Sequence, residues 1–200
     1  FVEDPTYFLA RNIFAKDFNL NVVSISMESD GINIEELKEK LNPDGNNYLY
    51  TIPTFHNPTG ITMSYKKRLE LCNIPNLTIF SDEVYQLLYF DEPPPPSLSL
   101  MSENVISLGS FSKILAPSLR LGWIHTSDKY MKVLKECGIM DSSGGLNPIT
   151  AAIVNKLMIE KHLDSNLLYL RQELKECCDS LYDGLEKNLP ENIEIKKPIG

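Results

Sequence analysis

Four short motifs place amide, carboxylate, amine and guanidinium groups beside short apolar segments of the chain. They are Asn57-Pro58-Thr59-Gly60, Asp82-Glu83-Val84-Tyr85, Ser110-Phe111-Ser112-Lys113 and Arg120-Leu121-Gly122. The apolar segments have the length and the β-branched content that are typical of strands. Because ligands of parallel α/β sheets bind at the carboxyl ends of the strands, we expect the motifs to meet at one edge of a sheet.

The third motif combines a lysine with two serines, a set of groups that suits imine and phosphate chemistry. A lysine amine attacks carbonyl carbons when it is partly desolvated, and the neighbours Phe111 and Ile114 are apolar. Seryl hydroxyls suit phosphate oxygens. Arg120, seven residues after Lys113, suits a bidentate phosphate contact. The alternatives are a solvated loop lysine for Lys113 and a salt bridge for Arg120.

The second motif places a carboxylate and a phenol three residues apart, directly after an apolar segment. A buried Asp82 carboxylate can hold a proton on a heterocyclic nitrogen, while the Tyr85 hydroxyl hydrogen-bonds a nearby oxyanion. In the first motif, the Asn-Pro and Thr-Gly pairs make a tight turn that can present the Asn57 amide. The alternatives are a helix N-cap for Asp82 and an ordinary turn for Asn57.

Taken together, the four motifs fit a single ligand. It would be a phosphorylated, protonated heterocycle that carries an oxyanion and forms an imine with the lysine. Pyridoxal 5′-phosphate has all of these groups, and a lysine imine with an acidic partner on the ring nitrogen is its usual protein signature.

The order and spacing of the motifs resemble the class I and II aminotransferases of the fold-type I pyridoxal-phosphate family. Asn57, Asp82, Lys113 and Arg120 follow one another at intervals of 25, 31 and 7 residues. The resemblance runs from Glu3-Asp4-Pro5 to the end of the chain. Within this family, its motif sequences are similar to those of the aminoadipate and aromatic types, and equally to those of the aminotransferase-like domain of MocR-type regulators.

The resemblance implies a role for each site residue. Lys113 would form the internal aldimine and then carry the proton between the substrate Cα and the cofactor. Asp82 would pair with the pyridinium nitrogen. Asn57 and Tyr85 would hydrogen-bond the 3′ oxygen, with Asn57 also holding the substrate carboxylate and its bond to Pro58 in the cis form. The residues implied to hold the phosphate are Ser110, Ser112 and Arg120.

The activity implied is transamination between an amino acid and a 2-oxo acid, by a homodimer. A C–S β-lyase or another pyridoxal-phosphate reaction is an alternative, because the same residues prepare the same carbanion. A sensor domain of a transcriptional regulator is a further alternative. The resemblance also implies missing parts: a phosphate-binding turn and a ring-stacking aromatic before Phe1, and a substrate-binding arginine after Gly200. We therefore expect a fragment that is incomplete as an enzyme.

Strands and helices alternate in the first three quarters of the chain, which predicts a three-layer α/β fold with a mostly parallel, mixed sheet. We expect helices after Asn33 and from Ser64, the second with an apolar face of Tyr65, Leu69 and Cys72. The strands we expect are Asn21–Ser26, Tyr48–Ile52, Leu77–Phe80, Val105–Leu108 and Leu121–His125. The proline run at 93–96 is interpreted as a connector rather than a ligand for a proline-binding domain.

The last quarter has a different pattern. Leucines and a cysteine repeat every three or four residues, which predicts one long helix or two with a break near His162–Asn166. A strand at Ile193–Ile195 would open a new unit. We therefore predict a cofactor-binding domain over 1–146, an interdomain helix or helix pair over 147–187, and the start of a small α+β domain over 188–200.

Composition excludes several other classes of protein. The 200 residues include Lys+Arg 19 and Asp+Glu 27, a net charge of −8 that disfavours nucleic-acid binding. No apolar run is long enough to span a membrane, and the first residues lack a signal-peptide layout. Four scattered cysteines form no disulfide framework, which indicates a reduced, cytoplasmic setting. No Cys/His spacing matches a zinc site, and His56 is expected to be packed or solvent-facing.

Overall fold

A twisted sheet organises the chain, and it is mostly parallel. The structure, a computed structural model, describes residues 1–138, 147–190 and 192–200. Its seven strands lie in the order β3-β2-β1-β4-β5-β6-β7. Their bounds are β1 Val2–Asp4, β2 Ser24–Glu28, β3 Gly31–Ile32, β4 Asn47–Thr51, β5 Leu77–Asp82, β6 Val105–Ser110 and β7 Gly122–Thr126. The five inner strands run parallel, and the edge strands β3 and β7 run antiparallel to their neighbours.

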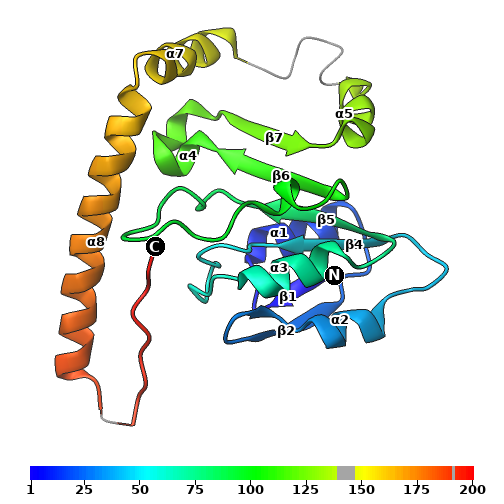
Figure 1. Ribbon diagram of the computed structural model, residues 1–200, viewed down its shortest axis with the longest axis horizontal. Helices are drawn as coiled ribbons and strands as arrows, with labels where there is room; N and C mark the ends of the chain where they lie inside the picture. Colours follow the sequence, from blue (N-terminus) through cyan, green and yellow to red (C-terminus); the bar gives the residue numbers. More distant parts are fainter. Residues whose placement is uncertain (139–146, 191) are drawn as a thin grey trace.

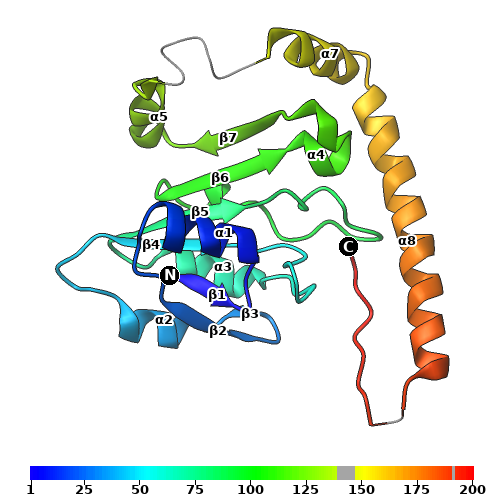
Figure 2. The ribbon, with the colours of Figure 1, turned by 180° about the vertical axis from the view of Figure 1, so that it is seen from behind.

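Helices cover both faces of this sheet, so the predicted three-layer architecture is confirmed. The helix α3 lies in front of the strands in Figure 1, while α1 lies in front of them in Figure 2, which views the molecule from behind. The bounds are α1 Phe8–Asn12, α2 Ile34–Lys40, α3 Tyr65–Cys72, α4 Phe111–Ile114, α5 Asp128–Lys135, α7 Pro148–Ile159 and α8 His162–Asn188, with a π-helix η1 at Ile13–Asp17 and 3₁₀ turns η2 at Leu98–Leu100 and η3 at Pro117–Leu119.

The parallel pairing of β4, β5 and β6 brings the carboxyl ends of these three strands together at one edge of the sheet. Thr51 pairs with Ser81, and Asp82 pairs with Leu108, so β4, β5 and β6 end close together. The strand β7 starts where β6 ends, with Gly122 opposite Ser110. The prediction that the four motifs share one edge of a sheet is therefore confirmed.

The main core lies between the sheet and the helices α2 and α3. Side chains alternate along a strand, so Leu49, Ile79 and Val105 point to this core while Tyr50 and Phe80 point to the opposite face. Both expected helix starts are confirmed: the Asn33 side chain accepts from the Glu36 N–H at 2.9 Å, and that of Ser64 accepts from the Lys67 N–H at 3.3 Å.

The buried side of α3 differs from the one expected. Cys72 packs against the core as expected, but Tyr65 and Leu69 are exposed, and the helix buries Arg68 and Leu71 instead. The Arg68 side chain can be buried because its guanidinium donates hydrogen bonds to backbone carbonyls inside the fold, which offset the cost of removing the charge from water. Apolar spacing alone therefore did not predict which face of α3 is buried.

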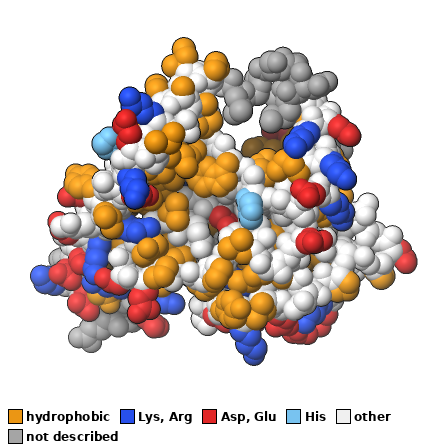
Figure 3. Space-filling view, turned by 45° about the horizontal axis from the view of Figure 1, so that its top comes forward, with side chains coloured by type: hydrophobic (Ala, Val, Ile, Leu, Met, Phe, Trp, Pro, Cys, Tyr) orange, Lys and Arg blue, Asp and Glu red, His pale blue; other side chains and the backbone are white. Residues whose placement is uncertain are grey.

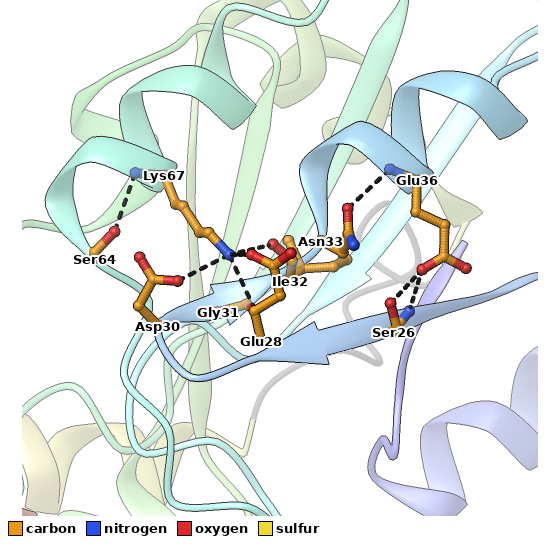
Figure 4. A network of polar contacts seen from close by, with 9 residues as sticks. All are labelled: Ser26, Glu28, Asp30, Gly31, Ile32, Asn33, Glu36, Ser64 and Lys67. Carbon is orange, nitrogen blue, oxygen red and sulfur yellow. Dashed lines mark hydrogen bonds and ion pairs between the residues drawn. The ribbon is translucent and has the colours of Figure 1, made fainter.

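A network of polar contacts links α2 and α3 to the strands and turn of β2 and β3 (Figure 4). The Lys67 amine contacts the carboxylates of Glu28 and Asp30, the latter at 2.9 Å, and donates to the Ile32 carbonyl at 3.0 Å. Next to it, the Glu36 carboxylate accepts from Ser26. The Lys40 amine and Ser26 hold the pKa of the Glu36 carboxyl at about 2. These contacts tie α2 and α3 to the edge of the sheet.

The last quarter of the chain forms two helices rather than one, α7 and α8. The chain turns between them at Lys161, whose φ is 58°, just before the break expected near His162–Asn166, and those residues lie in the first turns of α8. Only the first turns of α8 bury their apolar face: Leu163 and Leu167 pack against Phe111 and Ile114 of α4. The helix α8 then runs along one side of the sheet, and the last residues return beside it (Figure 1).

The expected strand at Ile193–Ile195 is wrong, because these residues are extended but have no neighbouring strand to pair with in the described chain. The boundaries 146, 187 and 188 between the proposed domains remain a prediction. No helix among the described residues is long and apolar enough to cross a membrane, and all four cysteines are free.

The core assignment predicts a large effect for one leucine and a small effect for another. Leu49 is 0% exposed in β4, so Leu49→Ala should lower the free energy of unfolding by about 2–5 kcal/mol through the cavity it leaves. Leu168 is 67% exposed on α8, so Leu168→Ala should change it by less than about 0.5 kcal/mol. Urea denaturation of the chain measures both values, and equal losses would contradict the assignment.

Candidate active site

The loop after β4 presents Asn57 at the edge of the sheet. Its turn is closed by two backbone hydrogen bonds, from the His56 N–H to the Ile61 carbonyl at 2.9 Å and from the Gly60 N–H to the His56 carbonyl at 2.6 Å. Gly60 has a φ of +70°, which favours glycine, and the Asn57–Pro58 bond is cis as the resemblance implied. The Asn57 amide nitrogen lies 3.5 Å from the Tyr85 hydroxyl, so the first two motifs meet.

Asp82 is the last residue of β5, and its carboxylate is half-buried. The Tyr50 hydroxyl donates to its Oδ2 at 2.7 Å, and the Val84 N–H makes a longer contact of 3.4 Å with its Oδ1. Burial raises the pKa of the Asp82 carboxyl above its ordinary value, and the hydrogen bond from Tyr50 opposes this shift. In the described chain a turn, not a helix, follows Asp82, which removes the N-cap alternative.

The third motif forms the end of β6 and the single turn α4. The Ser110 hydroxyl accepts from the Ser112 N–H at 3.1 Å, which starts the turn. The Lys113 side chain is exposed among the described residues, not desolvated as its apolar neighbours indicated, and its amine lies 5.8 Å from the centre of the Tyr85 ring. Its charge is close enough to Asp82 to lower the pKa of that carboxyl slightly. Lys113 therefore stands beside both the second motif and the serines.

Arg120 lies at the same edge of the sheet, just before the antiparallel strand β7. Its backbone is left-handed, with a φ of 50°, and it lies two residues before Gly122, the partner of Ser110. Within the part of the chain that the structure describes, its guanidinium makes no ion pair and donates only to the Pro117 carbonyl at 3.4 Å. The described residues thus give no support to the salt-bridge alternative.

A buried carboxylate that no sequence pattern predicted, Glu3, lies behind the Asn57 loop. Glu3 of β1 accepts from the Thr51 hydroxyl at 2.6 Å and from the Ile52 N–H at 2.9 Å. His56 is buried, as one of the two expected alternatives had it, and its Nε2 lies 3.0 Å from the Glu3 carboxylate without the alignment of a hydrogen bond. Because these partners are about 50 residues apart, no local pattern could reveal them.

Arg68 is a second buried charge next to this loop. Its guanidinium is 0% exposed and donates to the Pro53 carbonyl at 2.8 Å and the Thr54 hydroxyl at 2.7 Å. It also donates to the carbonyls of Met63 and Pro96. Burial lowers the pKa of Arg68 to about 10. Arg68 therefore joins both ends of the Asn57 loop to the proline run, which supports the connector interpretation of that run.

A cavity of about 510 Å³ opens beside the Asn57 loop. Asn57 and Tyr85 lie at its polar border. No Asp, Glu, Lys or Arg is among its lining residues. The remaining lining is mostly apolar and comes from the loop, from the segment after Tyr85, from α8 and from the chain end, including Phe55, Leu88, Phe90, Leu174 and Leu181.

The family model for aminotransferase class I and II matches residues 1–198. Aromatic-amino-acid aminotransferase 1 of Thermococcus litoralis is 35% identical over the whole chain, which covers 50% of that protein. An HTH-type transcriptional regulator of Bacillus subtilis, YisV, is 30% identical over 99% of the chain, which covers 42% of that regulator.

The fold is also that of a solved aminotransferase. The multiple substrate aminotransferase of Thermococcus profundus superposes with a TM-score of 0.90 at 31% identity, over 100% of this chain and 51% of that one. The chain thus spans about half the length of the proteins it matches.

The contacts of Arg68 predict that it holds the Asn57 loop in place. Arg68→Met leaves several buried carbonyl oxygens without donors, so the free energy of unfolding should fall by about 3 kcal/mol or more. Amide hydrogen exchange in residues 53–63 should accelerate at the same time. Lys66→Met, at an exposed position of the same helix, is the control and should change neither quantity. Unchanged exchange in Arg68→Met would contradict this role.

Proposed function

Because the chain belongs to the class I and II aminotransferases, we propose that its parent protein transfers amino groups between amino acids and 2-oxo acids with pyridoxal 5′-phosphate as cofactor. The observation that carries the proposal is the convergence of the four motifs at one edge of the sheet. The Asn57–Tyr85 contact of 3.5 Å and the Lys113–Tyr85 distance of 5.8 Å join three of them. The β6–β7 pairing places the fourth motif beside the third, because Gly122, two residues after Arg120, pairs with Ser110.

The chemistry of these groups fits the proposed cofactor. A half-buried carboxylate, Asp82, suits a protonated ring nitrogen. The Asn57 amide and the Tyr85 hydroxyl, 3.5 Å apart, could both donate hydrogen bonds to a phenolate oxygen of the cofactor. The hydroxyls and the guanidinium of the other two motifs suit a phosphate: they belong to Ser110, Ser112 and Arg120.

When bound, pyridoxal phosphate supplies an electron sink for the pair left behind as a substrate Cα loses its proton. The residues of the chain make that sink usable. Asp82 would keep the proton on the ring nitrogen, which favours drawing electrons toward the ring. Lys113 would hold the cofactor through its amine, and that amine, when free, would carry the proton from the substrate Cα to the cofactor.

The other residues orient the reacting groups. Arg120 and the serines would hold the phosphate, which would fix the orientation of the cofactor relative to the substrate bond that breaks. Asn57 would hydrogen-bond the substrate carboxylate as well as the ring oxygen. In a chain of net charge −8, Lys113 and Arg120 also make a local positive site that attracts an anionic cofactor and anionic substrates.

The cavity beside Asn57 suggests which amino donors fit. Its lining is mostly apolar and bears no carboxylate, lysine or arginine side chain, so we propose donors with large apolar or aromatic side chains. An acidic substrate side chain would lose its hydration there without a cationic partner.

A sensor domain of a transcriptional regulator is the second candidate function. The observation that favours it is the 30% identity to an HTH-type regulator over nearly the whole chain. The site geometry suits both functions, because a sensor that binds the cofactor needs the same groups.

We also propose a homodimer in the cytoplasm. Large apolar side chains are exposed on α1 and α7, among them Phe8 and Ile149. Figure 3 shows apolar side chains gathered from the top of one face toward its centre. Surfaces of this kind support association with another chain, and the free cysteines agree with a reducing compartment.

Lys113→Ala in the full-length protein should lower transamination more than about 1,000-fold, because it removes the amine proposed to move the Cα proton. The cofactor should still bind, without a covalent bond, and borohydride treatment should fix it to a Lys113 peptide only in the wild type. Lys129→Ala on α5 is the control and should retain activity. A Lys113→Ala variant with full transaminase activity would refute the proposal.

A donor screen with a common 2-oxo acid tests the substrate side. The full-length protein should use phenylalanine and leucine at least about tenfold better than aspartate, measured as kcat/KM, because of the cost of burying an unpaired charge. Leu174→Arg should narrow this difference by giving the cavity a cation. Leu168→Arg, outside the cavity on the same helix, should leave it unchanged. Equal use of aspartate by the wild type would contradict the assignment.

A further inference from the structure

Tyr50 stands directly behind the Asp82 carboxylate, one strand away. Its side chain is 6% exposed and packs edge-on against Phe14, with 5.5 Å between the ring centres. In the described chain its hydroxyl has one hydrogen-bond partner, Asp82 Oδ2 at 2.7 Å. A phenylalanine would fill the same space, so the hydroxyl adds nothing to the apolar packing. Its presence needs another explanation.

We propose that Tyr50 is a positioning residue, whose hydroxyl fixes the Asp82 carboxylate in the direction and the ionised form that a protonated ring nitrogen requires. The inference rests on the proposed function, because the ring nitrogen belongs to the proposed cofactor. A carboxylate has about four lone-pair sites. Tyr50 occupies one on Oδ2 and the Val84 N–H approaches Oδ1, so others remain for the ligand.

The surroundings of the pair explain why such a donor is needed. Half-burial of Asp82 favours its neutral form, and the Tyr50 hydroxyl is the largest influence in the opposite direction. Glu83 adds to the shift toward the neutral form, while Lys113 opposes it. A neutral Asp82 would not hold the ring-nitrogen proton in place.

The same surroundings keep Tyr50 a donor. Burial, the Asp82 charge and the nearby Glu3 and Tyr7 raise the pKa of the Tyr50 phenol far above its ordinary value, so it stays protonated. Among the described residues, Glu3 makes no hydrogen bond with the Tyr50 hydroxyl and accepts instead from Thr51 and Ile52.

Tyr48 is a matched control in the same strand. It lies two residues earlier, so it points to the same face of β4, but it is 52% exposed and its hydroxyl makes no hydrogen bond to any described residue. Removing its hydroxyl tests the effect of the substitution without the contact to Asp82.

The test uses full-length protein and pyridoxal phosphate labelled with ¹⁵N in the ring. We expect Tyr50→Phe to raise the Kd for the cofactor about tenfold, and to lower by about one pH unit the midpoint at which the ring nitrogen loses its proton, followed by ¹⁵N NMR. Asp82→Asn should move both quantities further in the same direction, and Tyr48→Phe should match the wild type. Wild-type values in a folded Tyr50→Phe protein would overturn the inference.

Two further comparisons keep the outcome decisive. If Tyr50→Phe does not fold, Tyr50→4-aminophenylalanine and Tyr50→4-methylphenylalanine replace it: only the former retains a donor, so only it should keep the ring nitrogen protonated as in the wild type. Equal behaviour of the two would overturn the inference. A wild-type protein that binds no pyridoxal phosphate would instead refute the proposed function, and the inference with it.

Discussion

The parallel pairing of β4, β5 and β6 is the constraint on which the site depends. Each strand leads into a different motif, and the pairing of Thr51 with Ser81 and of Asp82 with Leu108 aligns the strand ends. Sheet hydrogen bonds leave little freedom in this register, because a slip of one residue would turn every side chain to the opposite face. The antiparallel strand β7 starts at the same edge, and Arg120 lies two residues before its first residue.

Buried polar groups translate that alignment into fixed side-chain positions. Arg68 joins the ends of the Asn57 loop, Glu3 holds the backbone between β4 and that loop, and Tyr50 holds Asp82. A buried charge is costly unless it is hydrogen-bonded, so each of these residues has few alternative arrangements. The same network that stabilises the fold therefore orients the groups proposed to act on the cofactor.

Local patterns in the sequence predicted four of the five inner strands, the edge strand β7, the helix starts at Asn33 and Ser64, and the motifs after the strands. They did not predict the short strands β1 and β3. They failed where distant partners decide the outcome. On α3 the apolar spacing pointed to Tyr65 and Leu69, but carbonyls from distant loops allow Arg68 to be buried instead. At Ile193–Ile195 the apolar alternation lacks a neighbouring strand, and a strand needs a partner for its backbone hydrogen bonds.

The sequence by itself determined the family resemblance, the order of the four motifs and the chemistry of their side chains, because residue type and spacing are local properties. Only the tertiary structure decided which groups stand behind them. Tyr50 and Asp82 are 32 residues apart and meet only because β4 and β5 pair in one register. Such a contact depends on strand register and on burial, and neither is a property of a short segment.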